Sequence, residues 1–149
     1  MLGYFPMFIA TLSLVTSIYN GYLNSRFVDF IQRNAGRTEY LRTCKEIIDA
    51  YFQIRVRVTA INAAGDKTAA QSEAANAVAK FGALGTYLAN LRDEPTRQRY
   101  TQLTVDLEKL ASEASGLSAV ELGKRYEVPD RAFFEMNSDC IKSAKELPL

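Results

Sequence analysis

Histidine, which many enzymes use for catalysis or for binding metals, is missing from this sequence, and cysteine is scarce. The 149-residue chain contains no His and no Trp, and it has two cysteines, Cys44 and Cys140. Without histidine, the usual neutral-pH general base and the imidazole ligand for zinc or haem are both missing. The sequence also contains no phosphate-binding glycine loop and no nucleophile elbow. We therefore predict a protein that is not an enzyme, with no catalytic residue, no metal and no cofactor.

Acidic residues at helical spacing are the remaining candidates for a reactive site. Glu46 and Asp49 form one pair, and Glu108 and Glu113 form another. Di-iron bundles combine such acids with a Glu-x-x-His motif, which this chain cannot supply. The basic neighbours of the two pairs are Arg42, Lys45 and Lys109. Ion pairs in water are therefore the simpler interpretation of these acids.

The sequence allows two interpretations for a pair of arginines and two for the pair of cysteines. Arg55 and Arg57 flank an apolar seam, where they either bind an anion or pack their stems with the charged heads in water. Cys44 falls on that seam and suits a small apolar core position. If the last helix runs antiparallel to the third, Cys140 comes within a turn or two of Cys44. Outside the cytoplasm the two could then form a disulfide, and the sequence does not decide whether they do.

The N-terminal segment carries no charged side chain from Leu2 to Ser25, and it is mostly apolar up to Tyr19. About 20 mainly apolar residues cross a membrane as a helix, and aromatic residues favour its two ends. We therefore predict a single transmembrane helix over residues 1–25, a juxtamembrane segment over 26–36 and a helical bundle over 37–149. A buried core helix and a signal peptide are the alternatives, although no basic residue precedes the apolar run as a signal peptide requires.

The residues around the predicted span bear on its orientation and its contacts. Basic residues follow the span but do not precede it, which predicts an outside N-terminus and a cytoplasmic bundle. The basic residues are Arg26, Arg33 and Arg37. Ser13, Ser17 and Gly21 form a stripe of small residues, which lets membrane helices approach closely. An ordinary span without such a contact is the alternative interpretation of the stripe.

Downstream, three apolar series with alternating steps of three and four residues predict an antiparallel bundle with coiled-coil-like seams. The series are Tyr40, Cys44, Ile47, Tyr51, Ile54, Val58 and Ile61; Ala70, Ala74, Ala77, Phe81, Leu84, Leu88 and Leu91; and Tyr100, Leu103, Leu107, Leu110, Ala114 and Leu117. The series stay in step across both short connections. They predict layers such as Tyr40/Leu91/Tyr100 and Tyr51/Phe81/Leu110.

Glycine, proline and capping residues predict where these helices begin and end. The expected boundaries are a break at Asn34–Gly36, a stop at Gly65, a cap at Thr68 with Gln71, a restart at Asp93–Pro95, a stop at Gly116, a cap at Ser118 with Glu121, and an interruption at Pro129. The final helix begins at about Asp130. It either forms a kinked fourth member of the bundle or docks on the membrane-proximal end.

Residues 117–136 have the spacing of a helix-turn-helix, but their charges argue against DNA binding. Glu127 occupies the turn position that usually needs glycine. Asp130, Glu135 and Asp139 on the second helix would repel phosphates. We interpret the segment as a bundle helix and expect no nucleic-acid partner.

These observations predict an all-α, membrane-tethered interaction module, most simply an accessory or assembly subunit of a larger membrane complex. Its partners would be the membrane and either another protein or a second copy, through the membrane helix or the bundle. The alternative function is a sensory or small-ligand-binding bundle.

Overall fold

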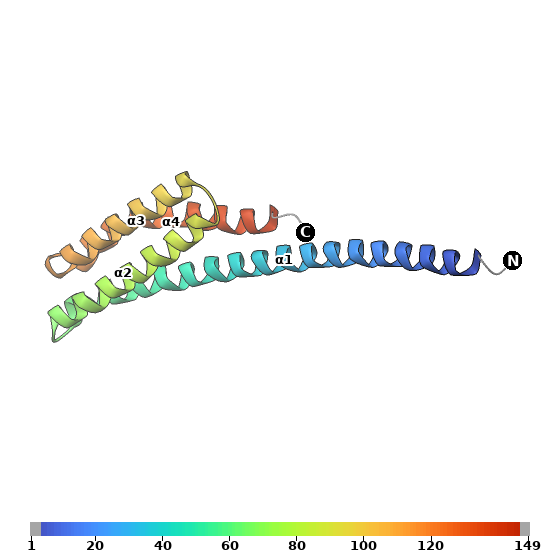
Figure 1. Ribbon diagram of the computed structural model, residues 1–149. Coiled ribbons are helices and arrows are strands. Elements are labelled where there is room, and N and C mark those ends of the chain that lie inside the picture. Colours follow the sequence, from blue (N-terminus) through green and yellow to red (C-terminus); the bar gives the residue numbers. More distant parts are fainter. Residues whose placement is uncertain (1–3, 147–149) are drawn as a thin grey trace. The chain divides into compact units, whose positions relative to one another are not determined.

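The computed structural model describes the backbone of residues 4–146 and the side chains of residues 11–143, and all elements in that part of the chain are helical (Figure 1). The elements are α1 (Tyr4–Ala60), η1 (Ile61–Ala63), α2 (Lys67–Asn90), α3 (Glu94–Glu113), η2 (Ala114–Gly116) and α4 (Ala119–Glu146). The prediction of an all-α bundle is confirmed. The backbone divides after Thr38 into two compact units.

Two predicted interruptions are wrong. The Asn34–Gly36 segment does not break the helix, because α1 continues through it to Ala60. A glycine inside a helix costs only about 1 kcal/mol relative to alanine, too little to end a long helix. Pro129 likewise lies inside α4. The buried side chains of Tyr126 and Phe133 hold α4 to the bundle on both sides of the proline, and this packing offsets the lost backbone hydrogen bond.

The predicted helix boundaries and caps are partly correct, and the restart expected at Asp93–Pro95 is observed. Asp93 caps α3 by accepting a hydrogen bond from the Thr96 amide at 2.9 Å. The Ser118 amide donates to the Glu121 carboxylate at 2.9 Å, as the predicted capping box requires. The cap of α2 is wrong by two residues, since Asp66 rather than Thr68 accepts from a first-turn amide. At the predicted glycine stops, Gly65 follows the short 3₁₀ turn η1 after α1, and Gly116 is the last residue of the 3₁₀ turn η2 after α3.

The core of the second unit lies among four helices. All seven members of the first predicted series are at most 5% exposed. In the third series Leu117 is partly buried and the others are buried. The second series is less accurate, because Leu91 is 51% exposed while Val78 and Gly85 are buried. Gly85 is covered by Tyr100 of α3, so the side of α2 that faces α3 differs from the predicted series.

The predicted register is right for one hairpin and wrong for the other. Tyr51 of α1 contacts Phe81 of α2 with ring centroids 6.0 Å apart, as expected. Across the next hairpin, Tyr100 lies against Gly85 rather than opposite Leu91. A Cβ atom at Gly85 would come within 2.7 Å of the Tyr100 ring. The glycine leaves a gap in α2 that admits the aromatic ring, and this contact sets the register of α3.

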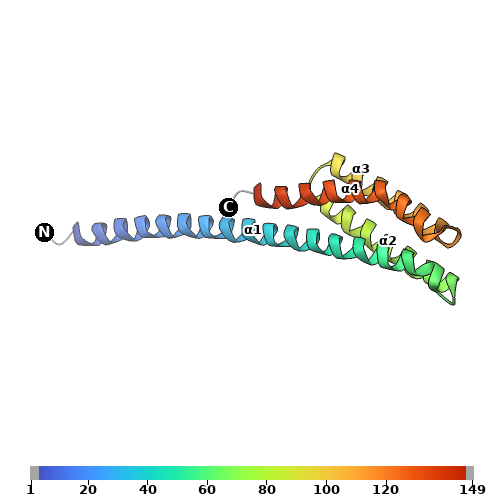
Figure 2. The ribbon, with the colours of Figure 1, turned by 180° about the vertical axis from the view of Figure 1, so that it is seen from behind.

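Helix α4 is the fourth member of the bundle and runs antiparallel to residues 39–60 of α1 (Figure 2). Cys140 near the end of α4 bonds to Cys44, while Asp130 nearer its start pairs with Arg55. The stack of Tyr51 on Phe133 lies between these two links, with ring centroids 3.8 Å apart. Two placements were considered for residues 118–149, and the described part of that segment, α4, is the fourth member of the bundle.

In the described part of the chain, no helix combines the length and the mean hydropathy needed to cross a membrane. The part of the predicted span that the structure describes is therefore not supported as a membrane-crossing helix. Its mean hydropathy is lowered by the Thr, Ser and Asn residues that are interspersed among the apolar residues from Thr11 to Asn24. The side chains of residues 1–10, the rest of the predicted span, lie outside the described residues.

Candidate functional site

A polar cluster joins α1 and α4 in the middle of the bundle. The Tyr51 hydroxyl donates to Asp130 Oδ1 at 2.6 Å, and Arg55 Nη1 donates to Asp130 Oδ2 at 2.8 Å. The Arg55 guanidinium also lies over the Tyr126 ring, 4.9 Å from its centroid. Both oxygens of one carboxylate are therefore engaged by α1, and the arginine is held between that carboxylate and an aromatic face.

Burial shapes the proton chemistry of this cluster. It raises the pKa of the Tyr51 phenol well above 10, and the hydrogen bond to Asp130 adds to the effect. Burial also raises the pKa of Tyr126. The Tyr126 hydroxyl is enclosed and has no hydrogen-bond partner among the described residues. Phenols that stay neutral to high pH do not act as bases near pH 7, so the cluster is suited to joining helices rather than to moving protons.

The arginines singled out from the sequence both have internal partners. Asp130 supplies the carboxylate for Arg55, and Glu73 pairs with Arg57 at 2.6 Å. The carboxylate of Asp130 therefore occupies the position that the anion-site alternative had left for a ligand of Arg55. From the sequence, Asp130 was considered only as a charge that would repel phosphates, and this pairing was not predicted. If the helical periodicity had been continued across Pro129, it would have predicted that Asp130 lies on the same helix as Tyr126 and Phe133.

The acidic pairs lie in ion pairs or in water. Glu46 lies 3.6 Å from Arg42, as expected, and Glu113 lies 3.6 Å from Arg125 of α4. Within the described residues, no group of three or more Cys, Asp or Glu side chains is arranged to hold a metal ion.

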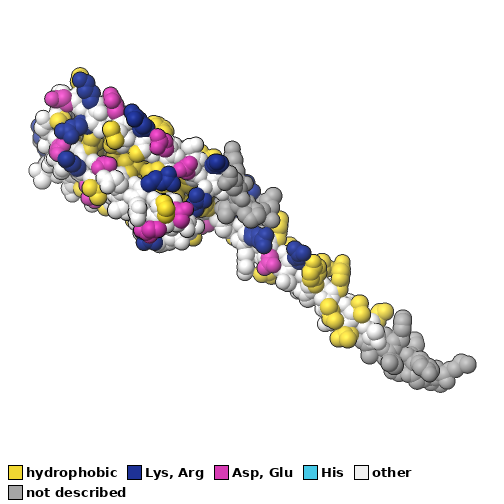
Figure 3. Space-filling view, turned by 90° about the horizontal axis from the view of Figure 1, so that it is seen from above, with side chains coloured by type: hydrophobic (Ala, Val, Ile, Leu, Met, Phe, Trp, Pro, Cys, Tyr) yellow, Lys and Arg dark blue, Asp and Glu magenta, His cyan; other side chains and the backbone are white. Residues whose placement is uncertain are grey.

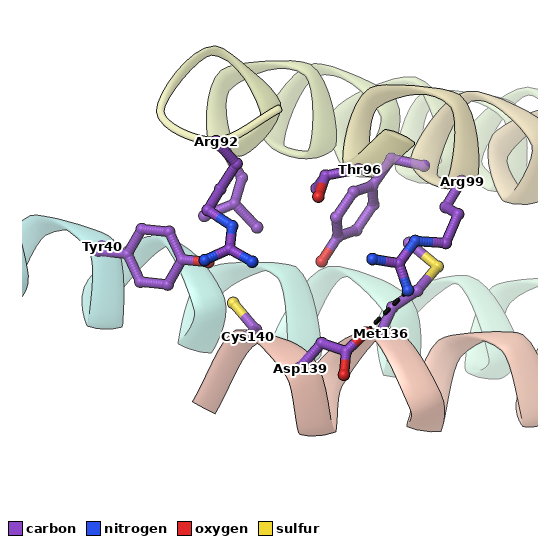
Figure 4. Close-up of a pocket in the computed structure, with 9 residues that line it drawn as sticks. Tyr40, Arg92, Thr96, Arg99, Met136, Asp139 and Cys140 are labelled. Carbon is purple, nitrogen blue, oxygen red and sulfur yellow. Dashed lines mark hydrogen bonds and ion pairs between the residues drawn. The ribbon is translucent and has the colours of Figure 1, made fainter. Parts of the chain in front are cut away.

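A small cavity lies at the end of the bundle where α2 joins α3, and Figure 4 shows the side chains around it. Arg92 points toward Tyr40 of α1, and Arg99 pairs with Asp139 of α4 at 2.8 Å. Cys140 also lines the cavity, and it is bonded to Cys44. Burial raises the pKa of Tyr40, while Arg92 acts in the opposite direction. The cavity has about 10 Å³ of free volume, room for roughly one water molecule.

An exposed apolar surface lies along residues 12–24 of α1 in the first unit (Figure 3). At about 100° per residue, seven large apolar side chains fall on one half of the helix. We call this half the arm face, and it comprises Leu12, Leu14, Val15, Ile18, Tyr19, Tyr22 and Leu23. Each of these side chains is between 46% and 65% exposed. A contiguous apolar surface of this kind is typical of an interaction site.

The small residues named from the sequence fall on the other half of the same helix. Ser13, Ser17 and Gly21 are exposed there, together with Asn20 and Asn24. A Cβ atom built at Gly21 has no neighbour within 4 Å among the described residues. Whether this stripe contacts another helix stays a prediction. The division into an apolar half and an uncharged polar half is a feature that the interpretation as a membrane span overlooked.

Comparisons of the chain with protein-family models, with curated proteins and with solved structures find no match.

Proposed function

We propose that this chain is a non-enzymatic, membrane-tethered interaction module whose arm face binds the interfacial layer of a lipid bilayer. The observation that carries the proposal is the separation of seven exposed apolar side chains from uncharged polar ones along residues 12–24. A helix divided in this way lies in the membrane surface, with its apolar half among the acyl chains and its polar half in water. Such a helix does not have to cross the bilayer.

The arginines after the arm face support the same proposal. Arg26 and Arg33 lie one to three turns beyond Tyr22, and Arg26 already contacts the Tyr22 ring and hydroxyl. Arginine next to an aromatic residue suits the headgroup layer, where the ring reaches the acyl boundary and the cation meets phosphate.

The bundle is the part of the module that would be presented to a partner, as in an accessory or assembly subunit. The side of the membrane on which the bundle lies is also part of this proposal. The arginines favour a cytoplasmic bundle, whereas a disulfide persists mainly in oxidising compartments. The Cys44–Cys140 bond therefore supports a position on the non-cytoplasmic side. The cavity beside Cys140 has only about 10 Å³ of free volume, too little for a ligand larger than water. The alternative of a ligand-binding bundle stays a prediction.

The absence of tryptophan allows a direct test of the arm face. Tyr19→Trp places a single fluorescent reporter on that face, and Tyr87→Trp places one on the exposed side of α2. Vesicles of phosphatidylcholine, with and without phosphatidylserine, are added to each full-length variant. We expect the emission of the residue-19 reporter to move to shorter wavelength as it enters the lipid, and that of the residue-87 reporter to stay constant.

Matched charge substitutions then test the face itself. In the Tyr19→Trp background, Ile18→Asp should weaken vesicle binding by about tenfold or more, because a charge must enter the apolar layer. Ser17→Asp on the opposite half should change binding little. Equal losses for both variants, or an emission spectrum that does not respond to lipid, would contradict the proposal. A blue shift that depends on protein concentration without lipid would assign the arm face to self-association instead.

A further inference from the structure

Three arginines follow the arm face on the same side of α1. We call Arg26, Arg33 and Arg37 the arginine line, because steps of seven and four residues keep them within about 40° of one another around the helix. Arg33 comes eighteen residues, or five full turns, after Val15 of the arm face, and Arg37 comes five turns after Tyr19. The arginine line therefore continues the middle of the arm face, and Figure 3 shows basic side chains next to this apolar surface.

The arginine line is not neutralised by the protein itself. Arg26 donates to the Tyr22 hydroxyl at 3.0 Å, and none of the three arginines forms an ion pair with a carboxylate among the described residues. Arginines of the bundle differ, because six of them do form such ion pairs: Arg42, Arg55, Arg57, Arg97, Arg99 and Arg125. The arginine line is thus free to bind an external anion.

Charge and aromatic character indicate which anion fits. Residues 12–38 contain three arginines and one acidic residue, Asp29, whereas the whole chain has a formal net charge of only +1. The positive charge is therefore concentrated beside the arm face. Phe30 lies between Arg26 and Arg33 on the same side of the helix, and its side chain is 52% exposed. An aromatic ring between cations suits the boundary between phosphate groups and acyl chains.

We propose that the arginine line binds the headgroups of anionic phospholipids, so that the arm attaches selectively to anionic bilayers. This inference rests on the proposed binding of the arm face to a bilayer. An anionic bilayer presents apolar and negatively charged groups on one surface, as the arm presents their complements on one side of one helix. The arm face enters the acyl boundary while the guanidinium groups donate hydrogen bonds to the phosphate oxygens. The line extends about 16 Å along the helix axis, long enough to meet several headgroups.

Vesicle titration of full-length Tyr19→Trp tests this selectivity. Vesicles of phosphatidylcholine alone are compared with vesicles that also contain phosphatidylglycerol, and the emission shift of the residue-19 reporter measures binding. We expect the anionic vesicles to bind about tenfold more tightly or better. Arg33→Gln/Arg37→Gln should lose most of this preference but bind the neutral vesicles as before. Glutamine has nearly the helix propensity of arginine, so the helix should be retained.

The matched control is Arg92→Gln/Arg131→Gln, which removes the same charge from the bundle and should keep the preference. Equal losses in the two double variants would mean that the net charge of the whole protein sets the preference, and would overturn the proposal. Raising sodium chloride from about 0.1 M to about 1 M shortens the Debye length to about 3 Å and should abolish the preference. A preference that survives high salt would also contradict an electrostatic origin.

The remaining outcomes separate this inference from the proposed function. Equal binding to neutral and anionic vesicles would refute the role of the arginine line and leave the arm face as the membrane-binding surface. Binding to neither kind of vesicle would refute both. Calorimetric titration with inorganic phosphate in the absence of lipid should show no binding. Binding of phosphate that Arg33→Gln/Arg37→Gln abolishes would assign the arginine line to a soluble anion and overturn the proposal.

Discussion

Asp130 joins two helices because each of its carboxylate oxygens accepts a hydrogen bond from a different side chain of α1. Tyr51 is fully buried, so its hydroxyl cannot turn to water if the carboxylate is lost, whereas the Arg55 side chain is 39% exposed and stays partly hydrated. The cost of removing Asp130 is therefore set by the partners left behind more than by the contact itself.

Asp130→Ala should lower the free energy of unfolding by about 1–3 kcal/mol, because it leaves the Tyr51 hydroxyl and the Arg55 guanidinium without their acceptor. Denaturant unfolding followed by circular dichroism measures the change. Asp139→Ala is the matched control, since it breaks an exposed ion pair on the same helix and should cost less than about 1 kcal/mol. In a double-mutant cycle, Tyr51→Phe should cost less in the Asp130→Ala background than in the natural chain. Fully additive changes would argue against the hydrogen bond.

Close packing of α2 on α3 depends on two glycines of α2. A Cβ atom at Gly82 would lie 3.0 Å from the Thr104 side chain, and one at Gly85 would lie 2.7 Å from the Tyr100 ring. The approach at Gly85 is too close for any real contact, and Tyr100 is buried, so the ring has little room to move. The pair Gly85 and Tyr100 therefore sets how α3 sits on α2.

Gly85→Ala should destabilise the protein by about 1–3 kcal/mol, because the added methyl group forces Tyr100 and α3 to shift. Thermal or denaturant unfolding measures the loss. Gly123→Ala on α4 is the matched control, since a Cβ atom there meets nothing within 4 Å among the described residues. At that position alanine should stabilise by about 0.4–1 kcal/mol through its higher helix propensity. Similar effects of the two substitutions would contradict the observed α2–α3 register.

Buried tyrosines make the free energy of unfolding of the whole bundle depend on pH in the alkaline range. Burial raises the pKa of Tyr51, Tyr100 and Tyr126 in the folded protein above the ordinary value of 10.0. The unfolded chain releases these protons at lower pH than the folded chain. The folded state thus binds more protons above pH 10, and stability must fall as pH rises there.

The free energy of unfolding should be nearly constant from pH 8 to pH 9 as far as these tyrosines are concerned, and should decrease steadily above about pH 10. Urea unfolding at a series of pH values measures the slope, and absorbance at 295 nm follows phenolate formation. Tyr126→Phe removes one titrating group together with a hydroxyl that lacks a partner, so this variant should lose less stability at pH 11. An equally steep decrease in the variant would exclude Tyr126 as a contributor.

Much of the bundle follows from local sequence pattern. The core face of α1, the cap at Asp93 and the capping box at Ser118 are fixed by periodicity and by short-range hydrogen bonds, which act within a few residues. The contact of Tyr51 with Phe81 also follows, because the α1–α2 connection is short and both faces are clearly apolar.

Other features depend on packing between distant segments, which a local pattern does not contain. The α2–α3 register depends on the fit of Tyr100 to Gly85, and the continuity of α4 through Pro129 depends on the packing that holds both halves of that helix. Asp130 finds Tyr51 and Arg55 only when α4 lies beside α1. The sequence by itself determined the helical class and which residues of α1 are buried, because helix periodicity is local. Only the tertiary structure decided the disulfide and the polar cluster, because each requires a residue near 130–140 to meet one near 44–55.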